Sequence, residues 1–487
     1  MESYRKMKSV TIAYIGGGSK NWAQKYFSDL LSQDKLNGII RLYDIDEKAA
    51  RLNEKYFTKM VEDNKNIIKS EWKCVYEPDI DKALQGADVV LISILPFELE
   101  RMRCDVHYPE KYGIYQPVGD TVGPGGYSRA LRTLGTFKYF GQKVKENCPN
   151  AWVINYTNPM SMCVNALFAG FPEIKAFGCC HEVFSSQKLI CGVMDMYNAL
   201  DEEGKKAFLA SDYKAVKAAL KRCGKKFSDY KRPKTERHAI YTNVQGVNHF
   251  TFINEANFNG EDLIPLYKAF VPMLNEHRRP FLKTRVKFDI YEKYGVFGAA
   301  GDRHLAEFIP EDYLPLGKKH YWRTGFILTT VRNRLIRNRL RRMQLWLLAN
   351  TRLKIKIKLS GEEGVYQLIA LFGLGDLISN VNIPNSGQAP GLPMGTAVET
   401  NAKFTDGKIE ALNAGEIANP VLRERVILHA GNQRDFVAAF FAKDKEGLRK
   451  VFMRDPSVAR LPEDKRYKLF DEMIAENKDI LEDWLVK

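Results

Sequence analysis

Apolar and polar positions along the chain follow two periods, one typical of buried strands and the other of amphipathic helices. Short apolar runs fall at residues 10–15, 39–43, 87–94, 152–156 and 174–178. Between them, apolar side chains recur three and four residues apart, as in the stretch containing Trp22, Tyr26 and Leu30. Strands that alternate with helices predict a doubly wound parallel sheet of the α/β class.

The pattern changes after residue 195. A strand pair is expected around residues 239–254, a loop at residues 385–393 and helices over residues 434–484. Helices with intervening loops are expected to make up most of the remainder. We therefore predict two domains, residues 1–195 with the parallel sheet and residues 196–487 with a mostly helical α+β fold.

Composition narrows the class of protein. The 487 residues are 45% hydrophobic and 27% charged, which is typical of a globular protein and excludes disordered and collagen-like chains. No segment approaches the ~18 apolar residues of a membrane helix, and the N-terminus lacks the apolar core of a signal peptide. Eight cysteines in so long a chain do not form a disulfide framework. We expect mostly buried thiols and a cytoplasmic location.

The net charge of +15 comes almost entirely from one segment. Residues 313–361 contain 13 Lys or Arg and no acid, which leaves +2 for the rest of the chain. An oligomer contact, an anion-binding patch and an altered reading of the underlying sequence all remain open for this segment. A main function in binding nucleic acid or a membrane surface is the alternative from another class, but no recognised nucleic-acid motif accompanies the arginines. We therefore expect neither partner.

A glycine-rich turn follows the first predicted strand. Gly16, Gly17 and Gly18 precede Ser19 and a predicted helix, so backbone N–H groups there can approach a pyrophosphate. The third glycine of the usual dinucleotide motif is absent, because Asn21 takes its place. Asp44 ends the second predicted strand, where a carboxylate accepts bonds from ribose hydroxyls and repels a 2′-phosphate. The segment therefore predicts a Rossmann-like NAD site.

Four clusters of chemically active side chains follow predicted strands or lie in turns. A thiolate and an imidazole from distant segments can hold a divalent metal and leave positions open for substrate oxygens, whereas finger-like zinc spacing is absent. Each cluster alone also has a structural explanation, such as a buried thiol or a local ion pair. The clusters are Thr157-Asn158-Pro159, Cys179-Cys180-His181-Glu182, Gly246-Val247-Asn248-His249 and Gly301-Asp302-Arg303-His304.

Together with the glycine turn, these clusters resemble the motifs of glycoside hydrolase family 4. The resemblance runs almost end to end. Cys-His-Glu-Val, which begins at Cys180, resembles the α-galacturonidase branch, whereas 6-phospho-glycosidases carry Cys-Asp-Met-Pro or Cys-Asn-x-Pro. Further matches are Asp120-Thr121-Val122-Gly123-Pro124-Gly125-Gly126, Asn382-Ile383-Pro384-Asn385 and Arg454-Asp455-Pro456.

The resemblance implies an NAD⁺- and Mn²⁺-dependent glycosidase that works by oxidation, elimination and addition. In such an enzyme a hydride leaves C3 of the sugar, a base removes the C2 proton and the aglycone leaves C1. Water then adds and the hydride returns, so no net oxidation occurs. A uronate-containing glycoside or small oligosaccharide is the implied substrate, and a homo-oligomer (dimer or tetramer) is the implied assembly.

The resemblance also implies roles for individual residues. Cys180 and His249 match the metal ligands. Asp302 matches the C2 base of the aspartate-bearing branches, where phosphoglycosidases have tyrosine. The expected sugar-binding residues are Asn158, Asp120 and His181, and His181 is an alternative helper of the leaving group. Arg303 is expected to bind the uronate carboxylate on chemical grounds, with a salt bridge to Asp302 or Glu307 as the alternative.

Two further enzyme activities remain open at this point. One is an α-galactosidase or α-glucosidase of the same family, because a single short motif carries the substrate distinction. The other is an NAD-dependent 2-hydroxy-acid dehydrogenase of the lactate or malate type, which shares the cofactor fold. The histidine-aspartate arrangement of those dehydrogenases has no obvious match in the chain, whereas the pair of Cys180 and His249 does match a metal site.

Overall fold

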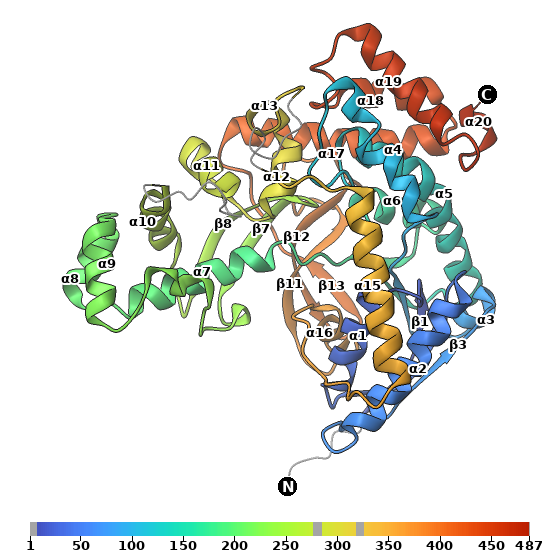
Figure 1. Ribbon diagram of the computed structural model, residues 1–487, viewed down its shortest axis with the longest axis horizontal. Helices are drawn as coiled ribbons and strands as arrows, with labels where there is room; N and C mark the ends of the chain where they lie inside the picture. The colour runs from blue at the N-terminus through green and yellow to red at the C-terminus, as the bar shows by residue number, and fades with distance from the viewer. Residues whose placement is uncertain (1–6, 276–284, 318–325, 487) are drawn as a thin grey trace.

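The computed structural model describes residues 7–275, 285–317 and 326–486. A nine-stranded sheet forms its centre, in the order β13-β12-β11-β6-β5-β4-β1-β2-β3 (Figure 1). The six strands from β3 to β6 pair in parallel and have the 3-2-1-4-5-6 order of a Rossmann fold. These strands are β1 (Lys8–Ile15), β2 (Leu36–Tyr43), β3 (Trp72–Tyr76), β4 (Val89–Ile92), β5 (Trp152–Asn155) and β6 (Lys175–Gly178).

Both faces of the parallel sheet are buried, which explains the near-continuous apolar runs in its sequence. Alternate residues of β1 belong to two separate cores. Ala13 and Ile15 belong to the first core, and Ile12 and Tyr14 belong to the second. The first core includes side chains of α3 (Ile80–Leu84), α5 (Gly123–Asn147) and α6 (Met160–Gly170). The second includes those of α1 (Trp22–Leu31), α2 (Glu47–Asn64) and α16 (Gly364–Leu371). The predicted doubly wound sheet is confirmed, and β3 is a strand that the apolar pattern missed.

Three antiparallel strands extend this sheet beyond β6. They are β11 (Leu377–Pro384), β12 (Ala397–Thr405) and β13 (Lys408–Ala411), and β11 joins β6 through the pair Asn382 and Gly178. The expectation of helices and loops in this part was wrong for residues 377–384, 397–405 and 408–411, which are strands. The strands were missed because polar residues interrupt their apolar pattern, namely Ser379, Asn380 and Asn382 in β11 and Glu399, Thr400 and Asn401 in β12. The predicted loop at residues 385–393 is confirmed.

A second, four-stranded sheet lies beside β12 (Figure 1). It consists of β7 (Tyr241–Val247), β8 (Phe250–Phe258), β9 (Glu261–Asp262) and β10 (Phe297–Gly298), so the predicted strand pair is confirmed. The helices around it are α7 (Phe184–Asn198), α8 (Glu202–Leu209), α9 (Tyr213–Arg222), α10 (Ile264–Asn275), α11 (Arg285–Tyr294), α12 (Asp302–Phe308) and α13 (Pro310–Tyr313).

The C-terminal helices return to the parallel sheet. Side chains of α17 (Pro420–Phe441), α18 (Lys445–Arg454) and α19 (Glu463–Glu476) share the core of α5 and α6, and α20 (Asp483–Val486) follows. Helices were predicted over this stretch, and they are confirmed. Short segments complete the fold: α4 (Met102–Val106), η1 (Leu99–Arg101), η2 (Pro109–Tyr112), η3 (Phe227–Lys231) and η4 (Arg237–Ala239).

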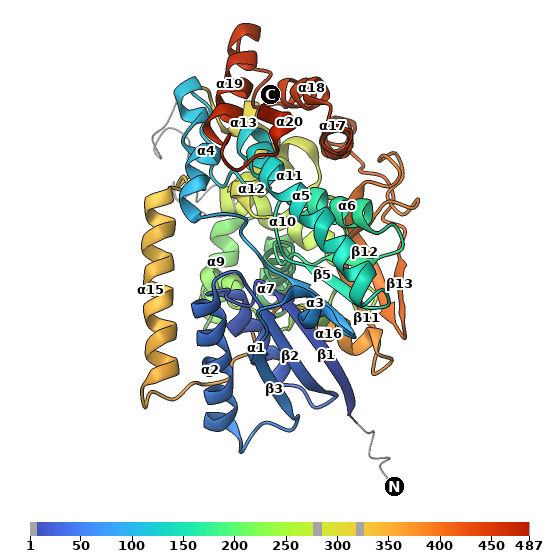
Figure 2. The same ribbon diagram turned by 90° about the vertical axis from the view of Figure 1, so that its right-hand side faces the viewer.

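The acid-free basic segment contains α15 (Val331–Asn350), which runs along α2 at the edge of the molecule (Figure 2). Residues 318–325 of the segment lie outside the described residues. The helix buries Leu345 and Ala349 and leaves most of its arginines exposed. Within the described ranges, no helix is both long and apolar enough to cross a membrane.

Candidate active site

The glycine turn between β1 and α1 is built around Asp44. Its Oδ2 accepts the N–H of Gly18 at 2.8 Å, and the N–H groups of Gly16 and Gly17 donate to the carbonyl oxygen of Tyr43. A Cβ atom on Gly18 would lie 2.8 Å from Asp44 Oδ2, and one on Gly16 would lie 2.2 Å from the carbonyl oxygen of Ser93. Only glycine fits these positions, so the turn brings the predicted cofactor residues together as a unit.

Ser19 completes this turn. Its hydroxyl accepts the backbone N–H of Trp22 at 3.1 Å, so it satisfies a free donor at the start of α1. The helix therefore begins directly beside Asp44 and the glycines. The arrangement is one in which a pyrophosphate meets backbone N–H groups and a ribose meets a carboxylate.

The main cluster of possible metal ligands consists of Asp120, His249 and His304. One ligand atom from each residue lies within 4.8 Å of the other two. Asp120 precedes α5, His249 occupies the β7–β8 turn with φ +69°, and His304 lies in the first turn of α12. The two imidazole rings stack with centroids 3.8 Å apart, and His304 Nδ1 is buried without a hydrogen-bond partner. Three distant segments thus offer one carboxylate and two imidazoles to one point.

Hydrogen bonds define the tautomer of His249. The hydroxyl of Thr121 lies 2.9 Å from Asp120 Oδ1 and 2.7 Å from His249 Nδ1. The single hydrogen of this hydroxyl is donated to Asp120 Oδ1. His249 must therefore carry its proton on Nδ1 and donate it to Thr121. This leaves the Nε2 lone pair of His249 free for a metal.

The electrostatics of the cluster favour a bound cation. Burial lowers the pKa of His249 to about 3, with a further contribution from His304, so its imidazole is neutral at pH 7. Burial opposes the ionisation of Asp120, but His304 and Arg129 hold the pKa of its carboxyl well below the ordinary value. A neutral imidazole and an ionised carboxylate are the protonation states that metal binding requires.

Cys180 and His181 follow β6 at the same end of the sheet. Cys180 is buried, and burial raises the pKa of its thiol well above the ordinary value, with Glu399 and Glu182 adding to the effect. It lies outside the cluster of three, so its predicted role as a ligand stays a prediction. The side chain of His181 is 43% exposed, and its ring packs against that of Trp22 at 5.5 Å.

Glu182 links this segment to the metal cluster. Its Oε2 accepts the N–H of Gly301 at 3.0 Å, immediately before α12. Burial opposes its ionisation, but His304, His249 and His181 lower the pKa of its carboxyl to about 2. No role was predicted for Glu182, although it belongs to the Cys-His-Glu-Val motif. Its contact joins the second and fourth of the predicted clusters.

Asn158 lies beside Asp120, as expected for two residues of one site. Its Nδ2 donates to Asp120 Oδ2 at 3.4 Å, and Arg129 Nε donates to its carbonyl oxygen at 3.1 Å. The Oδ1 atom of Asn158 is buried without a partner in the structure. This oxygen is therefore available to accept a bond from a bound hydroxyl.

Asp302 and Arg303 are engaged by neighbouring segments. The carboxylate of Asp302 accepts the N–H groups of Val286 and Lys287 at 2.8 and 3.2 Å and so caps the start of α11. Burial raises the pKa of Asp302 to about 7, although Lys287 counteracts the effect. Arg303 Nη2 donates to the carbonyl oxygen of Pro117 and to Thr329 Oγ1, while its Nε is buried without a partner. The roles of base and carboxylate binder stay predictions.

Glu307 was considered in the sequence only as a salt-bridge partner of Arg303, and the structure shows that it bonds the backbone of the loop before Asp120. It accepts the N–H groups of Val118 and Gly119 at 2.5 and 2.9 Å. Glu307 lies one helical turn after Arg303, whose guanidinium donates to the carbonyl oxygen of Pro117 in the same loop. Its burial raises the pKa of the carboxyl to about 8. Two side chains of α12 thus fix the loop that carries Asp120. The spacing of four between Arg303 and Glu307 was the available signal, because it places both on one helix face.

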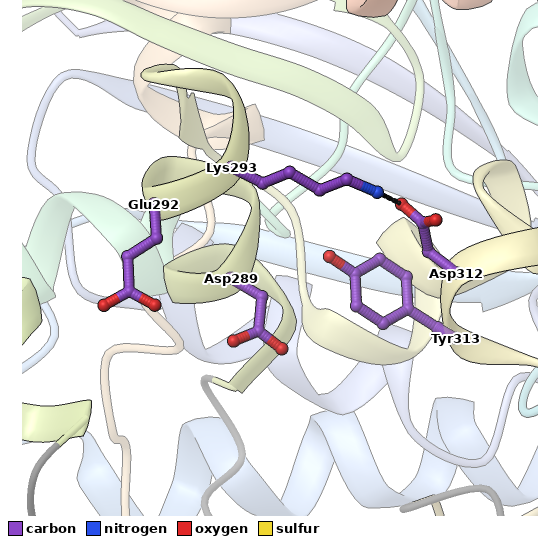
Figure 3. A pocket seen from close by; sticks show the side chains of 5 residues that line it. All are labelled: Asp289, Glu292, Lys293, Asp312 and Tyr313. Carbon is purple, nitrogen blue, oxygen red and sulfur yellow. Dashed lines mark hydrogen bonds and ion pairs between the residues drawn. The ribbon is translucent and has the colours of Figure 1, made fainter.

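A separate acidic hollow of about 420 Å³ lies between α11 and α13 (Figure 3). Lys293 crosses it to pair with Asp312 at 2.6 Å. None of the predicted site residues lines this hollow. The candidate site is therefore the cluster at the carboxyl end of the parallel sheet. The residues that line the hollow are Asp289, Glu292, Lys293, Asp312 and Tyr313.

We predict that Thr121→Val weakens Mn²⁺ binding about 10- to 100-fold, because the hydroxyl that orients His249 is lost. Isothermal titration of the purified protein with Mn²⁺ measures the effect. Thr133→Val is the matched control, since its buried hydroxyl bonds the carbonyl oxygen of Arg129 at 2.7 Å within α5. Equal Mn²⁺ affinities for the unmodified protein and Thr121→Val would contradict the assigned role.

The sequence matches two successive profiles, family 4 glycosyl hydrolase over residues 11–196 and its C-terminal domain over residues 244–458. It is 42% identical over 491 residues to an α-galacturonidase of Thermoanaerobacter italicus, across 98% of this chain and 99% of the relative.

Solved structures agree with the fold. A Bacillus subtilis protein described as a glucosidase is 36% identical, with a TM-score of 0.81 over 96% of this chain and 100% of that one. A Thermotoga maritima 6-phospho-β-glucosidase, solved with manganese, NAD⁺ and glucose-6-phosphate, is 18% identical and has the same fold (TM-score 0.71; 97% and 99% covered). Neither the dehydrogenase nor the nucleic-acid interpretation matches these similarities. The chain belongs to glycosyl hydrolase family 4.

Proposed function

We propose that this protein hydrolyses α-galacturonides with NAD⁺ and Mn²⁺ by transient oxidation of the sugar at C3. The observation that carries the proposal is the meeting of Asp120, His249 and His304 beside Asn158. It occurs in a chain that aligns over 98% of its length with an α-galacturonidase. The Cys-His-Glu-Val motif that begins at Cys180 supports the same substrate class.

The residues present fit a divalent cation. Imidazole and carboxylate donors suit Mn²⁺, His249 has a free Nε2, and His304 Nδ1 is buried and unpartnered. In the proposal Cys180 and His249 hold the cation, and Asp120 and His304 lie next to it. When bound, the cation supplies positive charge that stabilises sugar oxyanions, and NAD⁺ supplies a hydride acceptor.

The residues of the glycine turn fit NAD⁺. Gly16, Gly17 and Gly18 leave no room for side chains, and Ser19 fixes the start of α1. These features support binding of the pyrophosphate at the helix N-terminus. Each oxygen of Asp44 already accepts one N–H and retains a lone pair for a ribose hydroxyl. Its negative charge favours NAD⁺ over NADP⁺.

The remaining residues act on the sugar. Asn158 Oδ1 accepts a sugar hydroxyl, which orients the ring beside Asp120. Asp302 removes the C2 proton, and burial places the pKa of its carboxyl near 7, where a base and its conjugate acid are both populated. His181 is exposed enough to bind the sugar or to assist the leaving group. The unpartnered Nε of Arg303 supports binding of the uronate carboxylate.

We predict that the protein hydrolyses p-nitrophenyl α-galacturonide only when NAD⁺ and Mn²⁺ are both present. The test is a substrate panel of galacturonides, glucuronides, galactosides and 6-phosphoglycosides, each assayed for release of the aglycone. Removal of Mn²⁺ with a chelator should abolish turnover, and added Mn²⁺ should restore it. Faster cleavage of an α-galactoside than of the galacturonide would overturn the proposed substrate.

We predict that Asp302→Asn lowers turnover at least about 100-fold, because the C2 base is lost. Asparagine can still cap α11, so the fold should persist. Exchange of the C2 hydrogen with D₂O, followed by NMR, reports the step directly. Asp312→Asn, which removes an acid that pairs with Lys293 at the acidic hollow, is the control. Unchanged C2 exchange in Asp302→Asn would rule this residue out as the base.

We further propose a cytoplasmic homo-oligomer. All eight cysteines are free thiols, and seven of them are buried, which supports a reducing compartment. The assembly follows from the family resemblance, which implies a dimer or tetramer. Sedimentation velocity at micromolar concentration should show a species at least twice the 55.8 kDa mass of the chain. A monomer under these conditions would contradict the proposal.

A further inference from the structure

Glu399 is a buried acid at the boundary between the two sheets. It lies on β12, is 1% exposed and faces Asn382 in the antiparallel register of β11 and β12. Its two oxygens have different partners. Oε1 accepts Asn380 Nδ2 at 2.8 Å, and Oε2 accepts Asn248 Nδ2 at 3.0 Å. The hydrogen bonds found for this carboxylate thus come from amides of two separate elements.

These two amides belong to the surroundings of the two expected metal ligands. Asn248 directly precedes His249 in the β7–β8 turn. Asn380 lies on β11, and its Nδ2 also donates to the carbonyl oxygen of Cys180 at 3.3 Å. One carboxylate therefore connects the turn that holds His249 to the strand end that holds Cys180. These two segments belong to different sheets, and Figure 1 shows β7 beside β12.

The chemistry of this position is unfavourable for stability alone. A buried carboxylate loses its hydration, and neutral amides compensate for that loss only in part. The NH₂ groups of Asn248 and Asn380 donate to the shared acid, and that of Asn380 also donates to the backbone. Their Oδ1 atoms are buried without hydrogen-bond partners. An apolar side chain at this position would avoid the cost. A positional task therefore accounts better for the acid than stability does.

We propose that Glu399 is a positioning residue that fixes Cys180 relative to His249 and so sets the affinity for the catalytic cation. The inference rests on the proposed function, in which these two residues hold Mn²⁺. Glu399 is not one of the expected ligands or of the three residues whose ligand atoms converge. It acts through Asn248 on one side and through Asn380 on the other.

Glu399→Gln is the most direct test. The substitution keeps the volume of the side chain but replaces one acceptor with an NH₂ group, which must face an amide donor. A flip of the Asn380 amide would relieve this conflict, but it would remove the bond to Cys180. We therefore expect Mn²⁺ affinity to fall about 10- to 100-fold, as for other groups that orient metal ligands. NAD⁺ affinity should remain within about two-fold, because Asp44 and the glycine turn lie elsewhere.

A second measurement reports Cys180 itself. Co²⁺ replaces Mn²⁺ in the full-length protein, and a thiolate ligand produces a charge-transfer absorption band in the near ultraviolet. Cys180→Ser should abolish this band. Glu399→Gln should weaken it, while thermal unfolding shows that the protein remains folded. Asn380→Ala breaks the same connection from the other end. The double variant should lose no more Mn²⁺ affinity than the single variant that binds Mn²⁺ less tightly.

Glu363→Gln is the matched control. Glu363 is similarly buried and precedes α16, and its carboxylate pairs with Arg237 and Ser379 but bonds neither Asn248 nor Asn380. It should retain both Mn²⁺ affinity and the cobalt band, even if it lowers the melting temperature. A general loss of stability would instead reduce Mn²⁺ affinity equally in both variants and would overturn the proposal.

The remaining outcomes separate the two levels of the inference. A cobalt band in the unmodified protein that persists unchanged in Glu399→Gln, with unchanged Mn²⁺ affinity, would overturn the role of Glu399 alone. The absence of any thiolate band in the unmodified protein would overturn the assignment of Cys180 as a ligand and, with it, the positioning role.

Discussion

The packing of β12 against β7 is the contact on which the candidate site depends. The parallel sheet alone supplies the glycine turn, Asp44, Asn158 and the Cys180 segment. His249 belongs to a different sheet, and His304 to a helix beyond it. Only because β11 and β12 extend the parallel sheet past β6 does the β7–β8 turn come to lie near the ends of β5 and β6. The antiparallel extension therefore determines which residues share a site.

Carboxylates and imidazoles from distant segments converge at this site. Asp120 and Glu182 are partly buried, which opposes their ionisation, but the charge of His304 keeps the pKa of each carboxyl below its ordinary value, and His249 is neutral at pH 7. A buried group of anions is stable only with a compensating cation. A divalent ion supplies that charge at the point where the ligand atoms converge. The low dielectric of this part of the protein would strengthen the attraction between these groups and a divalent ion.

Local patterns in the sequence predicted every strand of the parallel sheet except β3 (Trp72–Tyr76), which forms no continuous apolar run. Buried strands produce continuous apolar runs, glycines mark a turn that admits no side chain, and the acid after the second strand accepts a hydrogen bond from that turn. Because the carboxyl ends of neighbouring parallel strands lie at one edge of the sheet, the sequence also predicted that Asn158 and the Cys180 segment lie at the same edge. These features depend on neighbours in the chain or on a fixed topology, so a single sequence reveals them.

Other features depend on contacts between residues far apart in sequence. Glu307 holds a loop 188 residues before it, and Glu399 bonds an asparagine 151 residues before it. The sequence does not reveal these partners, because a lone buried acid resembles a surface acid; for Glu307 the spacing from Arg303 shows only a shared helix face. The helix-capping contacts of Asp302 were missed for the same reason. Its motif indicated chemistry, whereas its contacts to α11 depend on where a separate helix begins.

The joining of β6 to β11 has a consequence for how the chain folds during synthesis. Gly178 pairs with Asn382, so the last parallel strand leaves the ribosome about 200 residues before its neighbour exists. At about 5–20 residues per second, that delay lasts roughly 10 to 40 seconds. Throughout it, the Rossmann half presents an unpaired strand edge to other nascent chains. This protein must therefore keep a largely formed sheet apart from its neighbours until nearly four-fifths of the chain has been made.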